Sequence, residues 1–279
     1  MKLSAPAKVN LSLRVLGKRA DGYHDLESLM APLSICDTVE INLEPGADNF
    51  SLTCSDLTVP GDASNLALVA AREFAAVTGV SPGGHIHLEK RIPHGAGLGG
   101  GSSNAAAVIR GLNTLTDLRL PWKKLEEIAA RVGSDVPFFI RGGAAWVRGR
   151  GERIDPCDLP QQFFLVLIKP PFGVSTAWAY SAWENAKHCE NPPLATTFGG
   201  VHWMNDLEAS VFRKFLLLPV LVQWLNEQPE TRIARMSGSG STVFAVCPTS
   251  ADAESLGSRA AAYLGGTFQI FIASTISRQ

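Results

Sequence analysis

The residues from 93 to 103 read Pro93-His94-Gly95-Ala96-Gly97-Leu98-Gly99-Gly100-Gly101-Ser102-Ser103. Residues with little or no side chain let backbone N–H groups approach an anion closely. The segment lies between an alternating strand pattern at 85–90 and an amphipathic helical pattern, whose first free amides and positive dipole end would face the same anion. Ser102 or Ser103 stands where a helix N-cap belongs, and both hydroxyls can donate to phosphate. The sequence therefore predicts that this segment, called the phosphate loop below, binds phosphate groups.

Three other interpretations of the phosphate loop fit less well. Gly95, Gly97 and Gly100 satisfy the dinucleotide pattern GxGxxG. However, the preceding strand alternates, and the acid required about 20 residues further on would be Asp117, which follows the helix. A Walker A loop is excluded because no Lys-Ser or Lys-Thr follows Gly101. A flexible linker has no reason to lie between a patterned strand and a patterned helix.

The composition of the chain limits its class. Of 279 residues, 46% are hydrophobic and 18% charged, which is typical of one large globular domain or two smaller ones. The 25 basic and 26 acidic residues are interspersed, so no nucleic-acid surface is expected. Five scattered cysteines argue against a zinc site or a disulfide framework and favour a reducing compartment. Without a targeting segment or an apolar run of roughly 18 residues, a cytoplasmic chain with no membrane partner is expected.

Hydrophobic periodicity predicts a mixture of strands and helices. Several strands alternate between apolar and polar residues, which favours α+β sheets with one covered face over a doubly wound parallel sheet. An Asp21-Gly22 turn signal follows the first strand, and Gly79 closes the first helix. Strands are expected at 9–15, 38–43, 85–90, 163–168 and 268–276, with a strand, glycine turn and strand at 235–246. Helices are expected at 66–74, 105–115, 122–132, 206–215, 219–226 and 251–264, and a loop at 183–203.

Taken together, three motifs resemble the GHMP kinase family, named for its galactose, homoserine, mevalonate and phosphomevalonate members. The phosphate loop has the family pattern Pro-x-x-x-Gly-Leu-Gly-x-x-Ser-Ser. The other two motifs are Pro6-Ala7-Lys8-Val9-Asn10-Leu11 and Met236-Ser237-Gly238-Ser239-Gly240-Ser241. The resemblance implies a two-lobed α+β kinase with its active site in the cleft between the lobes. An N-terminal ATP-binding domain is expected at 1–155, and a C-terminal domain that completes the substrate pocket at 156–279.

Further segments are similar to one branch of this family, which acts in the non-mevalonate isoprenoid pathway. They are Gly17-Lys18-Arg19-Ala20-Asp21-Gly22-Tyr23-His24, Ser134-Asp135-Val136-Pro137-Phe138-Phe139, Pro171-Phe172-Gly173-Val174-Ser175-Thr176 and Asn205-Asp206-Leu207-Glu208. The branch moves the γ-phosphoryl group of ATP to a tertiary alcohol on the erythritol portion of a cytidine diphosphate derivative. Ser134, Ser239 and Ser241 depart from the usual residues, but they remove no group that the reaction needs.

The resemblance also implies roles for individual residues. Asp135 is expected to be the catalytic base, with Lys8 beside it to keep the carboxylate ionised and to favour the forming alkoxide. Considered alone, Asp135 could cap a helix after Gly133, and Lys8 could be a surface residue on an edge strand. Asn10 is expected to contact the substrate diphosphate or to orient Lys8. Substrate contacts are also expected from Tyr23, His24, Thr176 and Tyr180, with the two tyrosines stacking on cytosine and His24 bonding the edge of the base.

ATP is expected to contact every residue of the phosphate loop, from Pro93 to Ser103. Asn65 and Lys90 would flank adenine, and the turn at Gly238 would lie beneath the loop, although its glycines could equally form a tight hairpin. Mg²⁺ is expected with ATP, and Ser103 is a candidate ligand. The partners are thus two small molecules, and the chain would be a monomer or a weak homodimer. The alternatives are another GHMP acceptor, an inactive nucleotide sensor, and an NAD-dependent oxidoreductase.

Overall fold

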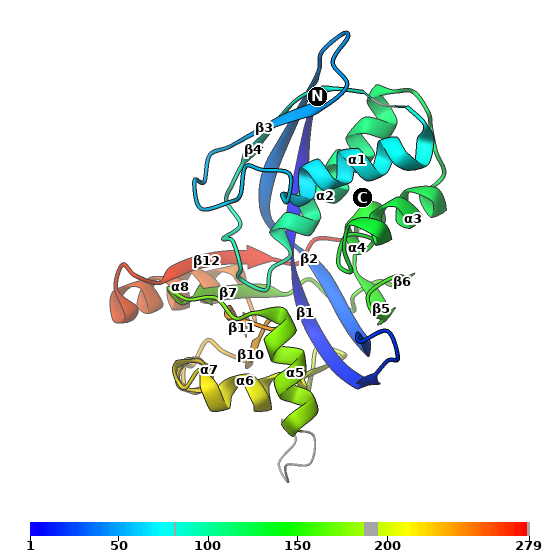
Figure 1. The fold of residues 1–279 in the computed structure, drawn as a ribbon. Coiled ribbons are helices and arrows are strands. Elements are labelled where there is room, and N and C mark those ends of the chain that lie inside the picture. Colours follow the sequence, from blue (N-terminus) through cyan, green and yellow to red (C-terminus); the bar gives the residue numbers. More distant parts are fainter. Residues whose placement is uncertain (81, 187–194, 278–279) are drawn as a thin grey trace.

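Two long antiparallel strands run through the middle of the molecule (Figure 1). The computed structural model describes residues 1–80, 82–186 and 195–277. Within it, β1 (Lys2–Lys18) pairs with β2 (His24–Leu43) from Lys2 opposite Glu40 to Lys18 opposite His24. The predicted turn at Asp21-Gly22 is confirmed between them. The predicted strand at 38–43 is the final part of β2, because the chain stays extended all the way from the turn.

These two strands form the centre of a large sheet. Its other strands are β3 (Phe50–Cys54), β4 (Gly84–Glu89), β5 (Ala145–Gly149), β6 (Arg153–Pro156), β8 (Thr196–Phe198) and β9 (Val201–Asn205). The order is β3-β4-β2-β1-β9-β8, and β5 pairs with both β2 and β6. As the alternation predicts, Ile86 and Leu88 of β4 point inward and are buried, whereas His85 and His87 are only partly buried.

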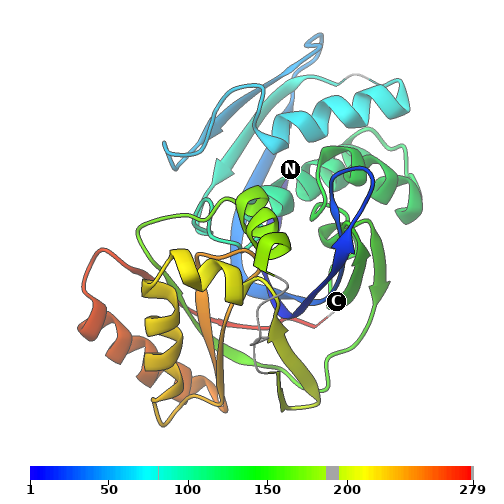
Figure 2. The same cartoon turned by 60° about the horizontal axis from the view of Figure 1, so that its bottom comes forward.

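One group of helices covers the large sheet, and its members lie together in both views (Figures 1 and 2). They are α1 (Leu66–Thr78), α2 (Gly100–Leu115), α3 (Trp122–Val132) and α4 (Phe138–Arg141). Asn65 caps the start of helix α1, and Gly79 caps its end, as the sequence predicts. The backbone of Gly79 is left-handed, which is common where a glycine ends a helix. Phe74 of α1 and Ile109 of α2 are fully buried in the core that these helices share with the sheet.

A smaller antiparallel sheet lies beside a second group of helices. Its order is β10 (Ile233–Met236), β11 (Val243–Cys247), β7 (Phe164–Lys169) and β12 (Gln269–Ser274). The helices are α5 (Thr176–Ala186), α6 (Glu208–Lys214), α7 (Leu217–Asn226) and α8 (Ser250–Leu264). The apolar run at 163–168 is confirmed as an interior strand, and the pattern at 235–246 as strand, turn and strand.

A third cluster of buried side chains joins the two sheets. Val9 and Leu11 of β1 belong to the same cluster as Leu165 and Leu167 of β7 and Trp203 of β9. Strand β9 also pairs in parallel with β1, so a segment from the second half of the chain extends the first sheet. The α+β fold is confirmed, and the division at residues 155 and 156 stays a prediction. Among the described residues, no helix is long and apolar enough to cross a membrane.

Some predicted boundaries are wrong. Helix α2 begins at Gly100 with Gly99 as its cap, so Ser102 and Ser103 lie in its first turn instead of capping it. The backbone of Gly99 is left-handed (φ 70°), which turns the chain into the helix earlier than a serine cap would. The predicted loop at 183–203 contains the end of α5, strand β8 and the first part of β9, while its residues 187–194 lie outside the described residues. Strands β3, β5 and β6 and helices α4 and α5 were not predicted, because too few of their residues follow a clear hydrophobic period.

Candidate active site

A cavity of about 440 Å³ brings the three sequence motifs together. Every residue from Pro93 to Ser102 lines it, together with Lys8 and Asn10 from β1 and Gly238 from the turn after β10. Asp135, Thr176 and Tyr180 line it as well. The cavity is therefore built from both halves of the chain, at the place where the two sheets meet.

The phosphate loop reaches this position by close backbone contact. Gly97 has a left-handed backbone (φ 76°), and a Cβ atom there would lie 2.6 Å from the carbonyl oxygen of Ser237. No larger residue fits between these two segments without displacing one of them. The last residues of the loop, from Gly100 onward, form the amino end of α2, which leaves backbone N–H groups without helical partners and whose dipole favours a negative charge. Such a helix end is suited to phosphate.

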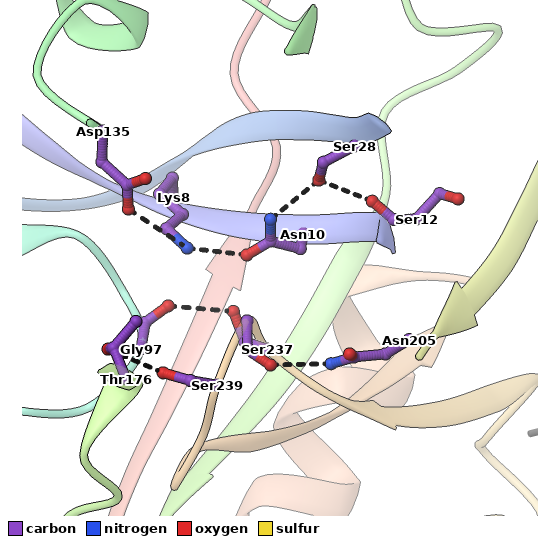
Figure 3. A network of polar contacts seen from close by, with 11 residues as sticks. Lys8, Asn10, Ser12, Ser28, Gly97, Asp135, Thr176, Asn205, Ser237 and Ser239 are labelled. Carbon is purple, nitrogen blue, oxygen red and sulfur yellow. Dashed lines mark hydrogen bonds and ion pairs between the residues drawn. The ribbon is translucent and has the colours of Figure 1, made fainter. Parts of the chain in front are cut away.

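The turn at 236–241, called the serine–glycine loop, packs against the phosphate loop. The hydroxyl of Ser237 donates to the carbonyl oxygen of Gly97 at 3.2 Å, as Figure 3 shows. The N–H of Thr242 donates to the carbonyl oxygen of Ala96 at 3.2 Å. The hydroxyl oxygens of Ser239 and Thr176 lie 3.0 Å apart. These bonds fix the serine–glycine loop beside the cavity, where the sequence places Gly238.

The side chains of Lys8 and Asp135 point toward one another (Figure 3). The Nζ atom of Lys8 lies 3.8 Å from Oδ2 of Asp135. Burial lowers the pKa of Lys8 below its usual value, and the charge of Asp135 partly offsets this effect. The backbone N–H of Lys8 donates to the carbonyl oxygen of Leu98 at 2.9 Å, where the pairing of β1 with β2 is interrupted. The lysine is thus tied directly to the phosphate loop.

A chain of buried polar groups orients Lys8. Its Nζ donates to Oδ1 of Asn10 at 2.6 Å, and Nδ2 of Asn10 donates to Oγ of Ser28 at 2.8 Å. The hydroxyl of Ser28 in turn donates to the carbonyl oxygen of Ser12 at 2.6 Å. Every group in this chain has a partner, which restricts the rotamers of Lys8. The contact agrees with one of the two predicted roles of Asn10, that of orienting Lys8.

A second polar network anchors the start of the phosphate loop. Asp37 of β2 is fully buried, and its Oδ1 accepts from the N–H groups of Arg91 and Ile92 at 2.7 and 2.8 Å. Its Oδ2 accepts from Nδ2 of Asn104 at 3.0 Å and from Nζ of Lys90. Lys90 lines the cavity, but its ammonium group is engaged by Asp37 and by Oδ1 of Asn104. The network therefore holds the strand-to-loop junction and the first turns of α2 together.

Asn65 lines the same cavity and has a structural task there. Its Oδ1 accepts from the N–H of Ala67 at 3.0 Å as the cap of α1, and its Nδ2 donates to the carbonyl oxygen of Pro60 at 2.6 Å. These bonds fix the segment before α1, of which Val59, Pro60 and Ser64 also line the cavity. The structure therefore brings Asn65 and Lys90 to the same cavity, as the predicted adenine pocket requires.

The predicted acceptor contacts are divided between the cavity and its surroundings. Thr176 and Tyr180 of α5 line the cavity, and burial raises the pKa of Tyr180. His24 is not among the lining residues, but its ring lies 5.3 Å from that of Tyr180, tilted by 30°. Tyr23, at the tip of the β1–β2 hairpin, is 51% exposed, and the guanidinium of Arg150 lies 5.1 Å from its ring centre. His24 therefore contacts a residue that lines the cavity, whereas Tyr23 contacts Arg150 and does not line the cavity.

A magnesium ion would find hard oxygen donors here. Ser102 and Asp135 line the cavity, whereas Ser103 does not, and its side chain is buried. Within the described part of the chain, the hydroxyl of Ser103 has no hydrogen-bond partner, and no group of three His, Cys, Asp or Glu side chains could hold a metal. Mg²⁺ usually binds through one or two protein oxygens, phosphate groups and water. These residues therefore fit a magnesium ion that arrives with a nucleotide.

Several residues of the site have no pattern in the sequence that identifies them. Ser28, Asp37 and Asn104 act through bonds to residues between 14 and 67 positions away. A single charged residue inside a largely apolar strand is a weak signal of a buried polar site. Asp37, between Cys36 and Thr38, is such a residue and is fully buried. A buried carboxylate needs partners, so its position alone could have suggested a polar network.

In comparisons with known proteins, both halves of the chain match domains of one family. Residues 65–143 match the GHMP kinases N terminal domain, and residues 199–265 match the GHMP kinases C terminal domain. A protein of Methylacidiphilum infernorum named 4-diphosphocytidyl-2-C-methyl-D-erythritol kinase is 44% identical over 87% of this chain and 84% of its own length. A protein of the same name from Heliobacterium modesticaldum is 36% identical over 100% of this chain and 96% of its own.

Solved structures of kinases superpose on nearly the whole chain. A crystal structure of 4-(cytidine 5'-diphospho)-2C-methyl-D-erythritol kinase superposes with a TM-score of 0.78 at 32% identity, covering 99% of this chain and 100% of its own. Homoserine kinase from Cytophaga hutchinsonii superposes with a TM-score of 0.74 at 19% identity, covering 100% and 95% of the two chains. The second likeness shows a shared fold alone.

Proposed function

The chain belongs to the GHMP kinase family, and we propose that it moves the γ-phosphoryl group of ATP to the tertiary 2-hydroxyl of 4-diphosphocytidyl-2-C-methyl-D-erythritol. The observation that carries the proposal is the pairing of Lys8 with Asp135, 3.8 Å apart, in a cavity that the phosphate loop lines. The relatives with this named activity resemble the chain over nearly its whole length. The proposed activity places the chain in the non-mevalonate route to isoprenoid precursors.

The phosphate loop supports a role in binding the ATP phosphates. Its backbone N–H groups and the amino end of α2 would neutralise the charge on the β- and γ-phosphates. Asn65 and Lys90 remain the proposed neighbours of adenine. Since Lys90 is paired with Asp37, its proposed contribution is the shape of the pocket and not a free positive charge. Gly238, on the serine–glycine loop, lines the same cavity and would support the phosphate loop.

The proposed chemical step follows from the positions of Asp135 and Lys8. The acceptor oxygen attacks the γ-phosphorus, the bond from that phosphorus to the β–γ bridging oxygen breaks, and ADP leaves. The proton of the acceptor hydroxyl passes to the carboxylate of Asp135, whose side chain is 42% exposed and therefore reachable from the cavity. The ammonium group of Lys8 would stabilise the negative charge that develops on the acceptor oxygen.

The acceptor itself would lie along α5 and the β1–β2 hairpin. Asn10, Thr176 and Tyr180 line the cavity and would contact the substrate. Because the rings of His24 and Tyr180 are in contact, a cytosine would stack on the surface they form together and not between them. Tyr23 is exposed at the tip of the hairpin, where it could cover the other face of the base.

Magnesium is proposed as the second part of the nucleotide complex. The phosphate oxygens would be its main ligands, and Ser102, which lines the cavity, is better placed to complete its coordination than the buried Ser103. When bound, the ion supplies charge neutralisation on the transferring phosphoryl group. The proposed partners are therefore ATP and a cytidine diphosphate derivative, in a chain that acts as a monomer or a weak homodimer in the cytoplasm.

A comparison of acceptors tests the proposal. ADP release is coupled to a spectrophotometric readout, and the cytidyl-methylerythritol substrate is compared with mevalonate and with homoserine at equal concentrations. We expect acceptor-dependent ADP release with the cytidyl substrate alone. Faster release with mevalonate or homoserine would assign the chain to another acceptor. Release that no acceptor changes would show that ATP is only hydrolysed.

A further inference from the structure

The side chain of Asn205 holds the serine–glycine loop from the side away from the cavity. Asn205 ends β9 and is 1% exposed. Its Nδ2 donates to the carbonyl oxygens of Met236 and Gly238, each at 2.8 Å. Both protons of the amide are therefore committed, and the backbone of the loop is fixed on either side of Ser237. Figure 3 shows the side chain of Asn205 pointing toward this part of the loop. Glu208 fixes Met236 a second time, since its Oε1 accepts from the N–H of that residue at 2.8 Å.

The segment that Asn205 holds is in direct contact with the proposed catalytic groups. A Cβ atom at Gly238 would lie 3.2 Å from Nζ of Lys8 and 3.1 Å from Oδ1 of Asn10, so the loop backbone packs against both side chains. Ser237, between the two bonded carbonyls, donates to Gly97 of the phosphate loop. A shift of the serine–glycine loop would therefore move the phosphate loop relative to Lys8.

Asn205 also belongs to the strand that is registered against β1. Strand β9 pairs in parallel with β1, with Asn205 opposite Leu13. Lys8 and Asn10 lie on β1, so one residue connects the strand of the proposed catalytic lysine with the loop beside it. The distance between these two parts is a quantity to which phosphoryl transfer is sensitive, because misplacement by about 1 Å can cost about 10²-fold in rate.

We propose that Asn205 is a positioning residue for phosphoryl transfer, which acts by fixing the serine–glycine loop against Lys8 and the phosphate loop. It touches none of the reacting groups. The inference rests on the proposed function, since it concerns the same site.

A purely structural role is the competing explanation. Oδ1 of Asn205 accepts from the N–H of Leu207 at 3.0 Å and so shapes the turn that precedes α6. The two roles use different atoms, and Asn205→Asp separates them. The aspartate keeps an acceptor for Leu207 but, when ionised, has no proton for the carbonyl oxygens of Met236 and Gly238. When protonated, its carboxyl group can donate to one of them again.

The experiment uses the full chain with Asn205→Asp, Asn205→Ala and the control Asp206→Ala. Asp206 is the neighbouring residue of the same motif, and its Oδ2 accepts from the N–H of Val15 on β1 at 2.8 Å. Its removal costs a bond to the same strand but leaves the bonds to the serine–glycine loop in place. Thermal unfolding, kcat and the KM values of ATP and of the acceptor are measured from pH 5.5 to 8.5. Activities are divided by those of the unsubstituted chain, because the charged and ionisable groups near the loop, which are Lys8, Asp135, Glu208 and Arg235, are present in every variant.

At pH 8 we expect Asn205→Asp to lower kcat about 50-fold and to leave the KM of the acceptor within about threefold. The ratio to the unsubstituted chain should recover at least about fivefold on acidification, as the carboxyl group gains its proton. Asn205→Ala should be equally slow with a ratio that does not recover, and Asp206→Ala should lose thermal stability with kcat within about twofold.

A kcat of Asn205→Asp within about threefold of normal at pH 8 would overturn the inference, and so would a pH-independent loss. Failure of the proposed function is separately visible, because the unsubstituted chain would then prefer another acceptor. The same ratios measured with that acceptor would still test Asn205.

Discussion

The ammonium group of Lys8 and the carboxylate of Asp135 lie 3.8 Å apart, yet the side chain of Lys8 is 5% exposed and that of Asp135 is 42% exposed. The ammonium group of Lys8 donates to Asn10, and its backbone N–H donates to Leu98 of the phosphate loop. The carboxylate of Asp135 is exposed to the cavity on its other side. This asymmetry suits a fixed positive charge beside a base that must reach the acceptor.

Replacement of the proposed base should separate chemistry from binding. In Asp135→Asn, the amide cannot take the acceptor proton, so we expect kcat to fall by about 10²–10⁴-fold. ATP affinity should change little, because the backbone of the phosphate loop is untouched. Steady-state kinetics and calorimetric titration with ADP measure the two quantities. Turnover close to normal in this variant would rule out Asp135 as the base.

The lowered pKa of Lys8 predicts an alkaline decline in activity. The ammonium is the active form, and burial lowers its pKa below 10.5, so charge is lost as the pH rises toward that value. The rate should therefore decline before pH 10.5, at a pH where the fold, followed by circular dichroism, is intact. Lys8→Arg keeps its charge over this range and should be slower but free of the decline. An unchanged alkaline decline in Lys8→Arg would assign the titration to another group.

Burial of Glu208 predicts that stability depends on pH. Its pKa is raised from 4.5 to about 7, chiefly because burial disfavours the charged form. Below pH 4.5 the carboxyl group of Glu208 is protonated in the folded and in the unfolded chain. Between pH 4.5 and about 7 it keeps its proton only in the folded chain. The free energy of unfolding should fall over this range by about 3 kcal/mol, and then level off. Urea unfolding of the normal chain and of Glu208→Gln measures the effect, which should be much smaller in the variant. An equal slope in both would exclude Glu208 as its source.

The buried carboxylate of Asp37 should be essential for the shape of the nucleotide site. In Asp37→Asn, an amide would face the Lys90 ammonium, so a paired charge becomes unpaired. We expect a loss of about 3–5 kcal/mol of stability and a KM for ATP that rises more than that of the acceptor. Asp37→Asn combined with Lys90→Met removes both charges and should regain part of the stability. No recovery in the double variant would show that the ion pair is not the reason for the loss.

The contact between Gly97 and Ser237 leaves no space for a side chain. In Gly97→Ala, the added Cβ would lie 2.6 Å from a carbonyl oxygen and the backbone would remain left-handed. We expect the affinity for ADP to fall by at least about tenfold, because the loops must separate. Gly266→Ala is the control, since nothing lies within 4 Å of a Cβ atom there. Equal ADP affinity in the two variants would show that this contact does not shape the site.

The sequence predicts the parts of the site that depend on neighbours along the chain. The phosphate loop, the Lys8 motif and the serine–glycine loop are each recognisable within six to eleven residues, because glycines and small polar groups have specific backbone uses. Helix α3 was predicted at its observed bounds, since Gly133 ends a strong apolar period.

The polar networks behind the site could not be predicted in this way. Asp37 and Lys90 are 53 residues apart, and Asn10 and Ser28 are 18 apart. Their contacts depend on the register of β1, β2 and the start of α2, which only the assembled sheet determines. The start of α2 was predicted wrongly for a related reason. Gly99 caps the helix through its backbone conformation, which leaves no side-chain signal.

Analysis of the product tests the central claim most directly. The full chain is incubated with equimolar ATP, Mg²⁺ and the cytidyl-methylerythritol substrate, and the products are followed by ³¹P nuclear magnetic resonance. A phosphate ester on a tertiary carbon has no hydrogen on that carbon, so its resonance lacks three-bond proton coupling. We expect one such phosphomonoester, formed in step with ADP by the normal chain and at least about 10²-fold more slowly by Asp135→Asn. A monoester with three-bond proton coupling, or inorganic phosphate in its place, would contradict transfer to the 2-hydroxyl.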